Sequence, residues 1–298
     1  MKKYKTLPNL IIIGAQKAGT TSLFNWLAQH PEIYGDESLK DFNFFLDDFY
    51  YKELGIEWFS KQFKPKNNEK IIMHGFVNYM YFYDIAIERL YEYKKKYRKD
   101  LKLIAILRNP IDRAYSAFWD AKKVTRENAS TFEEAFKKEK FILAKGSYKE
   151  KASLTYIDHG FYFIQLKNFK KIFREDIKIL IFEELISNPE REIKNLFKWL
   201  SIDETFLPSL KKINESGLPK NLFIQKFIQQ LSAPKFLKGI IPMRIKYLKW
   251  KLSRELNIKK INYPPINEET RKYLLNVYIE DIKNLEKLLG KDLSIWLK

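Results

Sequence analysis

The first strong pattern along the chain joins a short apolar run to a helical one. Residues 10–13 are continuously apolar and end at Gly14, which is typical of a strand buried on both faces. From Thr21 to Gln29 the apolar residues recur at helical spacing, and the pattern stops at His30-Pro31. The sequence therefore predicts a strand, a glycine-bounded loop and a helix in direct succession.

The same order of strand and helix occurs a second time. An apolar run over residues 101–107 ends at Arg108-Asn109-Pro110, and a helical pattern follows over residues 111–123. Two units of the same design indicate neighbouring strands that run in the same direction.

A third apolar run covers residues 177–182 and ends at Glu183-Glu184. An amphipathic segment over residues 162–173 precedes it, and a helical pattern over residues 189–200 follows. Strands that alternate with helices favour a parallel sheet covered on both faces. We therefore predict an α/β protein with three α/β/α layers around a central parallel sheet, in a single domain over residues 1–298.

The stretch over residues 214–265 has a different character. It is basic and apolar, and Pro219, Pro234 and Pro242 interrupt it. It can be read as helices packed around the core or as a surface for a partner or a membrane. An amphipathic helix is expected after it, over residues 267–289.

Charge and cysteine content limit the chemistry. Lys and Arg outnumber Asp and Glu by 55 to 37, which gives a net charge of +18 and attracts nucleotides, polyanions and anionic membranes. No zinc-finger, basic-zipper or aromatic RNA-binding signature accompanies this charge, so we expect no nucleic-acid partner. The absence of cysteine excludes disulfides, thiolate nucleophiles and Cys-ligated metals. The N-terminal apolar run is too short for a signal peptide or a membrane span, so a cytoplasmic location is expected, with peripheral membrane association as an addition.

The loop between the first strand and helix has the composition of a phosphate-binding loop. Gly14 and Gly19 stand at the two glycine positions of a G-x-x-x-x-G-K-[ST] motif, between a strand and a helix. Glycines let the backbone approach an anion, and the helix N-terminus offers unpaired amides. The lysine, however, lies inside the loop, and Thr20 stands where an NTPase has lysine. The expected phosphate-binding residues are Gln16, Lys17, Ala18, Gly19, Thr20, Thr21 and Ser22, and the fold is predicted to be P-loop-like.

A second phosphate site is indicated at the end of the second strand. An NTPase needs a carboxylate at the end of a neighbouring strand to hold Mg²⁺, whereas this strand ends in Arg108. A guanidinium is a fixed positive fork for a phosphate, and with Ser116 it suggests a second, metal-independent site. Two separate phosphate sites fit a nucleotide phosphorylated on both its 5′ and 3′ sides.

These motifs resemble those of sulfotransferases that use 3′-phosphoadenylyl sulfate (PAPS), in particular the carbohydrate and heparan-sulfate branch. The loop from Gly14 to Ser22 is similar to the family's 5′-phosphosulfate loop. Arg108, Pro110, Arg113 and Ser116 match its 3′-phosphate motif R-x-P-x-x-R-x-x-S. The stretches around Tyr162 and over residues 214–220, with Ser216 and Lys220, resemble further nucleotide-contacting segments.

The resemblance implies in-line transfer of a sulfuryl group from PAPS, without a metal, to a hydroxyl or amine of a carbohydrate or glycolipid acceptor. It implies that Lys17 lies near the bridging oxygen and that Arg108 and Ser116 hold the 3′-phosphate. The family's Lys-Glu pair before Phe-Phe is matched by Lys40 and Asp41, so Asp41 is the expected base and Lys40 its partner. No oligomeric state is assigned.

Three alternatives stay open, one for the base and two for the function. His74 is a rival base, because sulfotransferases of small phenols and steroids use a histidine, although Asp41 is preferred. The chain could also be a nucleotide kinase or NTPase with Glu183 or Glu184 as the metal carboxylate, or a basic protein that binds nucleic acid or a membrane surface.

Overall fold

Five parallel strands form the central sheet of the protein. The structure is a computed structural model that describes residues 6–66, 69–210, 217–230, 239–252 and 257–297. The strands lie in the order β2-β3-β1-β4-β5. Their bounds are β1 Leu10–Gly14, β2 Ile33–Gly35, β3 Ile71–Gly75, β4 Lys102–Leu107 and β5 Ile177–Ile181. Each neighbouring pair is parallel, which confirms the predicted sheet.

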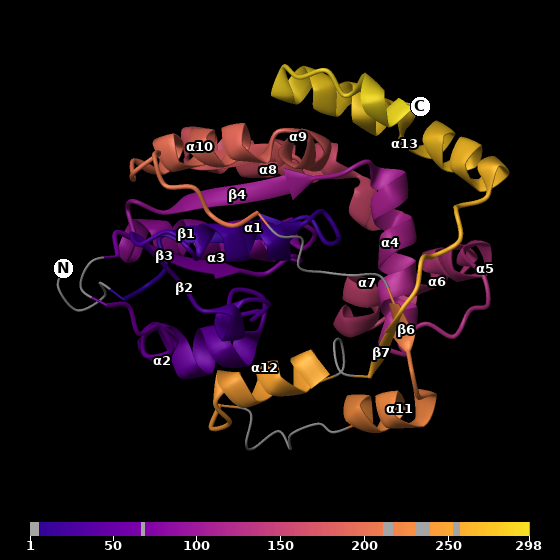
Figure 1. Cartoon of the computed structure of the whole chain (residues 1–298), viewed down its shortest axis with the longest axis horizontal. Coiled ribbons are helices and arrows are strands. Elements are labelled where there is room, and N and C mark those ends of the chain that lie inside the picture. Colours follow the sequence, from indigo (N-terminus) through magenta and orange to yellow (C-terminus); the bar gives the residue numbers. More distant parts are fainter. Residues whose placement is uncertain (1–5, 67–68, 211–216, 231–238, 253–256, 298) are drawn as a thin grey trace. The chain divides into compact units, whose positions relative to one another are not determined.

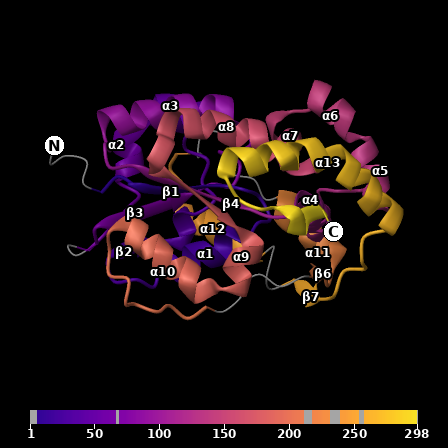
Figure 2. The same cartoon turned by 90° about the horizontal axis from the view of Figure 1, so that it is seen from above.

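Helices cover both faces of this sheet. Figure 2 shows α3 (Tyr83–Lys96) on one face and α1 (Thr20–Leu27), α9 (Phe182–Ser187) and α10 (Pro189–Leu200) on the other. Every residue of β1 and β3 is buried, because each of these strands has a neighbour on both sides and helices above and below. The predicted three-layer α/β/α fold is therefore confirmed.

The contacts divide the chain into two compact units. The first, the sheet unit, comprises residues 1–108, 168–214 and 242–244 and contains all five parallel strands. The second, the helical unit, comprises residues 109–167, 215–241 and 245–298. The assignment of residues 1–298 to one sulfotransferase domain stays a prediction.

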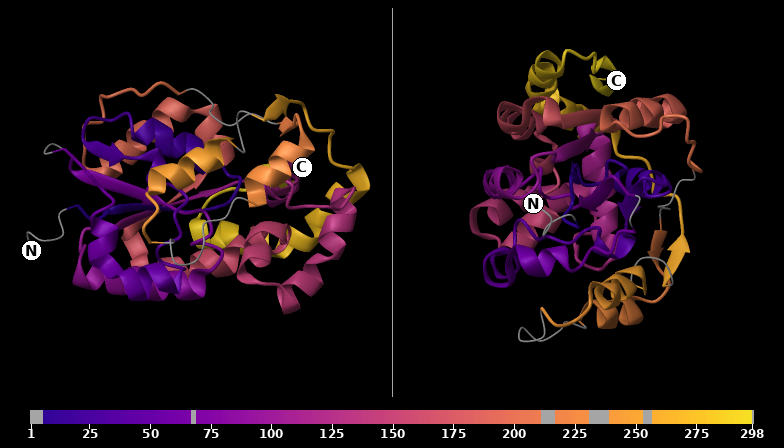
Figure 3. Two further views of the ribbon diagram at one scale, coloured as in Figure 1. Left: turned by 90° about the horizontal axis from the view of Figure 1, so that it is seen from below. Right: turned by 90° about the vertical axis from the view of Figure 1, so that its left-hand side faces the viewer.

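The helical unit is built around α4 (Pro110–Lys123), which contacts α13, α7, α5 and the strand β6. A short antiparallel ribbon pairs β6 (Gly217–Pro219) with β7 (Ile258–Lys260), and helix α11 follows β6 (Figures 1 and 3). The remaining helices are α2 Gly55–Ser60 in the sheet unit, α5 Phe132–Lys137, α6 Glu139–Lys145, α7 Tyr148–Leu154, α8 Tyr162–Phe173, α11 Leu222–Gln230, α12 Met243–Lys251 and α13 Glu268–Leu289.

The long periodic segments of the sequence were predicted well, whereas β2, β3 and α3 were not. The three predicted apolar runs form β1, β4 and β5, and all five predicted helical segments form helices. β3 has the sequence Ile-Ile-Met-His-Gly, and the histidine interrupts the apolar run that would otherwise have indicated a buried strand. β2 has three residues, too few to show a period.

Candidate functional site

Three strands of the sheet unit end side by side and carry the predicted site residues. β1 lies between β3 and β4, so the loop after Gly14 is flanked by the ends of both neighbours. The backbone amide of Ala15 donates to the carbonyl of Ile106 in β4 at 2.7 Å, which ties the start of the loop to that strand. In open α/β sheets, ligands bind at the carboxyl ends of the strands, which is where this loop lies.

The N-terminus of α1 has the free donors that an anion requires. Gly19 is its N-cap residue in the left-handed conformation, and no side chain of the described residues caps the helix. The first intrahelical bond runs from the amide of Leu23 to the carbonyl of Gly19 at 3.1 Å. The amides of Thr20, Thr21 and Ser22 precede that bond, so they are available to a phosphate or sulfuryl oxygen.

Close backbone packing explains both loop glycines. Gly19 has a φ of 86°, and a Cβ there would lie 2.9 Å from Cε2 of Phe182. A Cβ at Gly14 would lie 2.8 Å from the Cβ of Met80 and 3.0 Å from the carbonyl oxygen of Val77. A larger residue at either position would push the loop out of its present path.

Arg108 is held against the loop by two contacts. Its Nη1 donates to the carbonyl oxygen of Lys17 at 3.3 Å, and its guanidinium lies over the ring of Phe182, 5.1 Å from the centroid. Phe182 therefore contacts both Gly19 and Arg108. Phe182 was predicted only as the end of the third apolar run, so this role was missed, although an aromatic residue directly after a buried strand was a usable signal.

Lys40 and Asp41 form an ion pair at the end of β3. Nζ of Lys40 lies 2.8 Å from Oδ2 of Asp41, and the two side chains are 4% and 32% exposed. The amide of Asp41 donates to the carbonyl of Gly75, the last residue of β3, at 2.8 Å. Asp41 thus has a partly exposed carboxylate beside a buried cation. It lies at the carboxyl end of β3, the strand next to β1.

Aromatic packing fixes the segment that carries this pair. Phe42, Phe44 and Phe45 are buried, and the Phe44 ring stacks on that of Phe59 at 3.9 Å with an interplanar angle of 8°. Such packing limits the freedom of the backbone at Asp41, which adopts a φ of 63°.

His74 lies in the interior rather than at a surface. It is fully buried in β3, with Nδ1 3.2 Å from the carbonyl oxygen of Leu39 and Nε2 3.0 Å from the hydroxyl of Tyr79. Burial lowers the pKa of His74 to about 4, so the ring is neutral near pH 7. A buried imidazole with both nitrogens hydrogen-bonded supports the segment that leads to Asp41, and the choice of Asp41 over His74 as the base stays a prediction.

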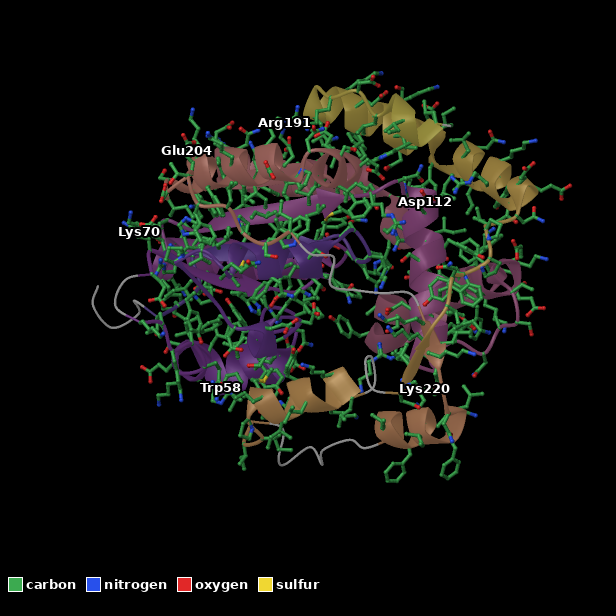
Figure 4. All side chains as sticks on the ribbon, in the orientation of Figure 1. Trp58, Lys70, Asp112, Arg191, Glu204 and Lys220 are labelled. Carbon is green, nitrogen blue, oxygen red and sulfur yellow. The ribbon has the colours of Figure 1, made fainter. Side chains whose placement is uncertain are left out.

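Three other predicted nucleotide contacts belong to the helical unit. Ser116 is half-buried on α4, and Lys220 is exposed at the end of β6 (Figure 4). The side chain of Tyr162 is 1% exposed, so its ring serves packing, and its amide donates to Oδ2 of Asp281 at 3.0 Å. Ser216 lies outside the described residues.

A buried carboxylate organises the chain just before Tyr162. Glu139 accepts hydrogen bonds from the amides of Tyr156, Ile157 and Asp158 at 2.6–2.9 Å, and its burial raises its pKa. The guanidinium of Arg113 donates to the carbonyl of Tyr156 and is itself fully buried. Arg113, although part of the R-x-P-x-x-R-x-x-S pattern, therefore holds the interior of the helical unit.

Neither a membrane-spanning helix nor a metal-ligand cluster occurs in the part of the chain that the structure describes. None of its helices is both long and apolar enough to cross a bilayer. Within the same residues, no three His, Cys, Asp or Glu side chains are grouped to hold a metal ion.

Comparison with known proteins gives a consistent picture. The family described as "Sulfotransferase domain" matches residues 7–257. Heparan sulfate N-deacetylase/N-sulfotransferase 1 of Caenorhabditis briggsae is 28% identical over 208 residues, which cover 67% of this chain and 23% of that protein. Human heparan sulfate glucosamine 3-O-sulfotransferase 5 is 26% identical over 197 residues, which cover 66% of this chain and 54% of that protein.

The chain thus spans from about a quarter to about half of the length of these curated relatives. Among solved structures, the sulfotransferase from Alicyclobacillus acidocaldarius superposes with a TM-score of 0.69 at 24% identity, covering 98% of this chain and 99% of that one. This similarity agrees with the fold described above.

Proposed function

Since the chain belongs to the sulfotransferase domain family, we propose that it transfers a sulfuryl group from PAPS to a hydroxyl or amine of a carbohydrate acceptor, without a metal. The proposal rests above all on Arg108, whose guanidinium is held against the carbonyl of Lys17 at the end of β4. That position, beside the phosphate loop, carries a cation where a metal-dependent NTPase requires a carboxylate.

The residues of the loop suit the phosphosulfate end of PAPS. The open amides of Thr20, Thr21 and Ser22 can bind sulfuryl and phosphate oxygens, and the macrodipole of α1 favours the negative charge. Lys17, within the same loop, supplies a cation for the bridging oxygen. Arg108 is assigned to the 3′-phosphate, and Ser116, Tyr162, Ser216 and Lys220 stay predictions for the rest of the nucleotide.

The proposed reaction is a single in-line displacement. The acceptor oxygen or nitrogen forms a bond to sulfur while the bond from sulfur to the bridging phosphate oxygen breaks. The electron pair of that bond leaves with adenosine 3′,5′-bisphosphate, where the cation of Lys17 stabilises it. The carboxylate of Asp41 takes the acceptor proton, and Lys40, 2.8 Å away, orients that carboxylate.

The kinase or NTPase alternative fits the sheet order less well. Glu183 and Glu184, its proposed metal ligands, follow β5, which is separated from β1 by β4. Of the two strands beside β1, β4 is followed by Arg108 and β3 ends in Gly75. The arrangement therefore favours sulfuryl transfer over Mg²⁺-dependent phosphoryl transfer.

The proposed acceptor class follows from the relatives. Two of them are heparan sulfate sulfotransferases by name, acting on an anionic polysaccharide, and a chain of net charge +18 suits such an acceptor. A glycolipid headgroup offers the same hydroxyls. The cytoplasmic location expected from the sequence stays a proposal.

Transfer of labelled sulfate tests the proposal. The chain is incubated with ³⁵S-labelled PAPS, EDTA and heparan oligosaccharides whose glucosamine is either N-sulfated, which offers hydroxyls, or unsubstituted, which also offers an amine. Labelled oligosaccharide in the presence of EDTA is the expected result. Hydrolysis of Mg-ATP, with no transfer from PAPS to any oligosaccharide or glycolipid, would contradict it.

A further inference from the structure

Helix α11 turns its apolar residues outward and its glutamine inward. Phe223 and Phe227, four positions apart on one side, are 81% and 57% exposed, while Gln225 is fully buried. Leu222 and Ile224 are also exposed. Figure 4 shows aromatic rings that project outward from α11. A helix of a globular protein normally buries its apolar side and exposes its polar one, so this orientation is the reverse of the usual one.

Polar contacts fix this orientation. Nδ2 of Asn257 donates to Oε1 of Gln225 at 3.1 Å and to the carbonyl of Asn221 at 2.8 Å. Oδ1 of Asn221 caps the helix by accepting from the amides of Phe223 and Ile224, at 2.9 and 3.1 Å. Rotation of α11 that buried its phenylalanines would break the bond to the buried glutamine. The apolar side therefore stays outward.

The sequence segment that contains α11 has charge of one sign. Residues 216–254 contain nine Lys or Arg and no Asp or Glu. Lys220, before the helix, and Lys226, within it, are exposed. The next helix, α12, also exposes Ile245 and Leu248, at 55% and 56%. A segment of apolar and cationic residues with no carboxylate in its own sequence matches the two regions of an anionic bilayer: hydrocarbon and negatively charged headgroups.

We propose that the outward side of α11, formed by Leu222, Phe223, Ile224, Lys226 and Phe227, docks on the surface of an anionic lipid bilayer. The phenylalanines insert below the headgroups, and the lysines contact lipid phosphates. The inference concerns where the enzyme acts and does not rest on the sulfuryl transfer proposed above. It would place the chain beside acceptors that are themselves attached to membranes.

Vesicle flotation of the whole chain tests the proposal. Vesicles of phosphatidylcholine with phosphatidylglycerol are expected to carry the protein, and vesicles of phosphatidylcholine are expected to carry much less. The double variant Phe223→Ser/Phe227→Ser should lower the partition coefficient at least about tenfold, because two large apolar side chains no longer leave water. Lys226→Gln should lower it less and reduce its dependence on salt.

Phe141→Ser is the matched control, since Phe141 on α6 is 67% exposed but lies outside the proposed surface. It should leave flotation unchanged. Equal binding to both vesicle types, or equal loss in the Phe141 variant and the double variant, would overturn the proposal. So would a concentration-dependent dimer in sedimentation that the double variant abolishes. Sulfuryl transfer to a soluble oligosaccharide is measured on the same preparations. A failure of membrane binding can then be told apart from a failure of the proposed reaction.

Discussion

The Nη1 of Arg108 donates a hydrogen bond to the backbone carbonyl of Lys17, 3.3 Å away. The bond joins the end of β4 to the middle of the phosphate loop, so the two motifs recognised separately in the sequence form one structure. A guanidinium already positioned in this way loses little freedom when it binds a phosphate.

Arg108→Lys should weaken binding of adenosine 3′,5′-bisphosphate about tenfold, because lysine keeps the charge but loses the planar fork and the contact with Phe182. Binding of adenosine 5′-phosphate should change much less. Isothermal titration measures both. Arg191→Lys is the control, because Arg191 is exposed on α10 (Figure 4). Equal losses of affinity for both nucleotides would mean that Arg108 does not bind the 3′-phosphate.

Gly19→Ala should destabilise the protein and weaken nucleotide binding, whereas Gly290→Ala should cause only backbone strain. Both glycines are in the left-handed conformation, with φ of 86° and 61°, but a Cβ at Gly19 meets Phe182 at 2.9 Å and one at Gly290 meets nothing within 4 Å. Strain alone costs about 1 kcal/mol. Thermal unfolding should therefore show the larger loss for Gly19→Ala, partly restored by adding Phe182→Leu. Indistinguishable variants would contradict the close packing of the loop.

Asp41→Asn should lower kcat by at least about a hundredfold while leaving the affinity for adenosine 3′,5′-bisphosphate unchanged, since the amide keeps the shape but cannot accept the proton. Asp84→Asn, an exposed carboxylate in the first turn of α3, controls for charge. Steady-state transfer assays and titration give the two quantities. Full activity of Asp41→Asn would mean that another residue is the base.

His74 should make stability depend on pH. Burial lowers the folded-state pKa of His74 from 6.5 to about 4, so the unfolded chain binds the proton more readily between those values. Stability from the neutral ring is fully present above pH 6.5 and is lost as the pH falls towards 4, by up to about 3 kcal/mol.

Urea unfolding from pH 7 to pH 4 checks this expectation. His74→Gln should show a flatter dependence than the wild type, although it is less stable at pH 7. If the stability of the wild type and that of His74→Gln depended on pH in the same way, the ring would be protonated in the folded protein or would reach solvent.

The sequence predicted the parallel sheet and the phosphate loop because both rest on local patterns. Continuous apolar runs marked β1, β4 and β5, and two glycines at fixed spacing marked the loop. The position of Phe182 directly after a buried strand could have marked it as a candidate. Its partners Gly19 and Arg108 could not be predicted, because these contacts arise only when β5 has paired with β4. The burial of His74 could not be predicted either, since one histidine among apolar residues is equally compatible with a buried strand and with a functional site.

Calorimetric titration with adenosine 3′,5′-bisphosphate in EDTA is the sharpest test of a metal-independent site for a 3′-phosphorylated nucleotide. We expect saturable binding without a metal, at least about tenfold tighter than binding of adenosine 5′-phosphate, because only the first nucleotide uses Arg108. Binding of Mg-ATP, with no binding of adenosine 3′,5′-bisphosphate in EDTA, would contradict it.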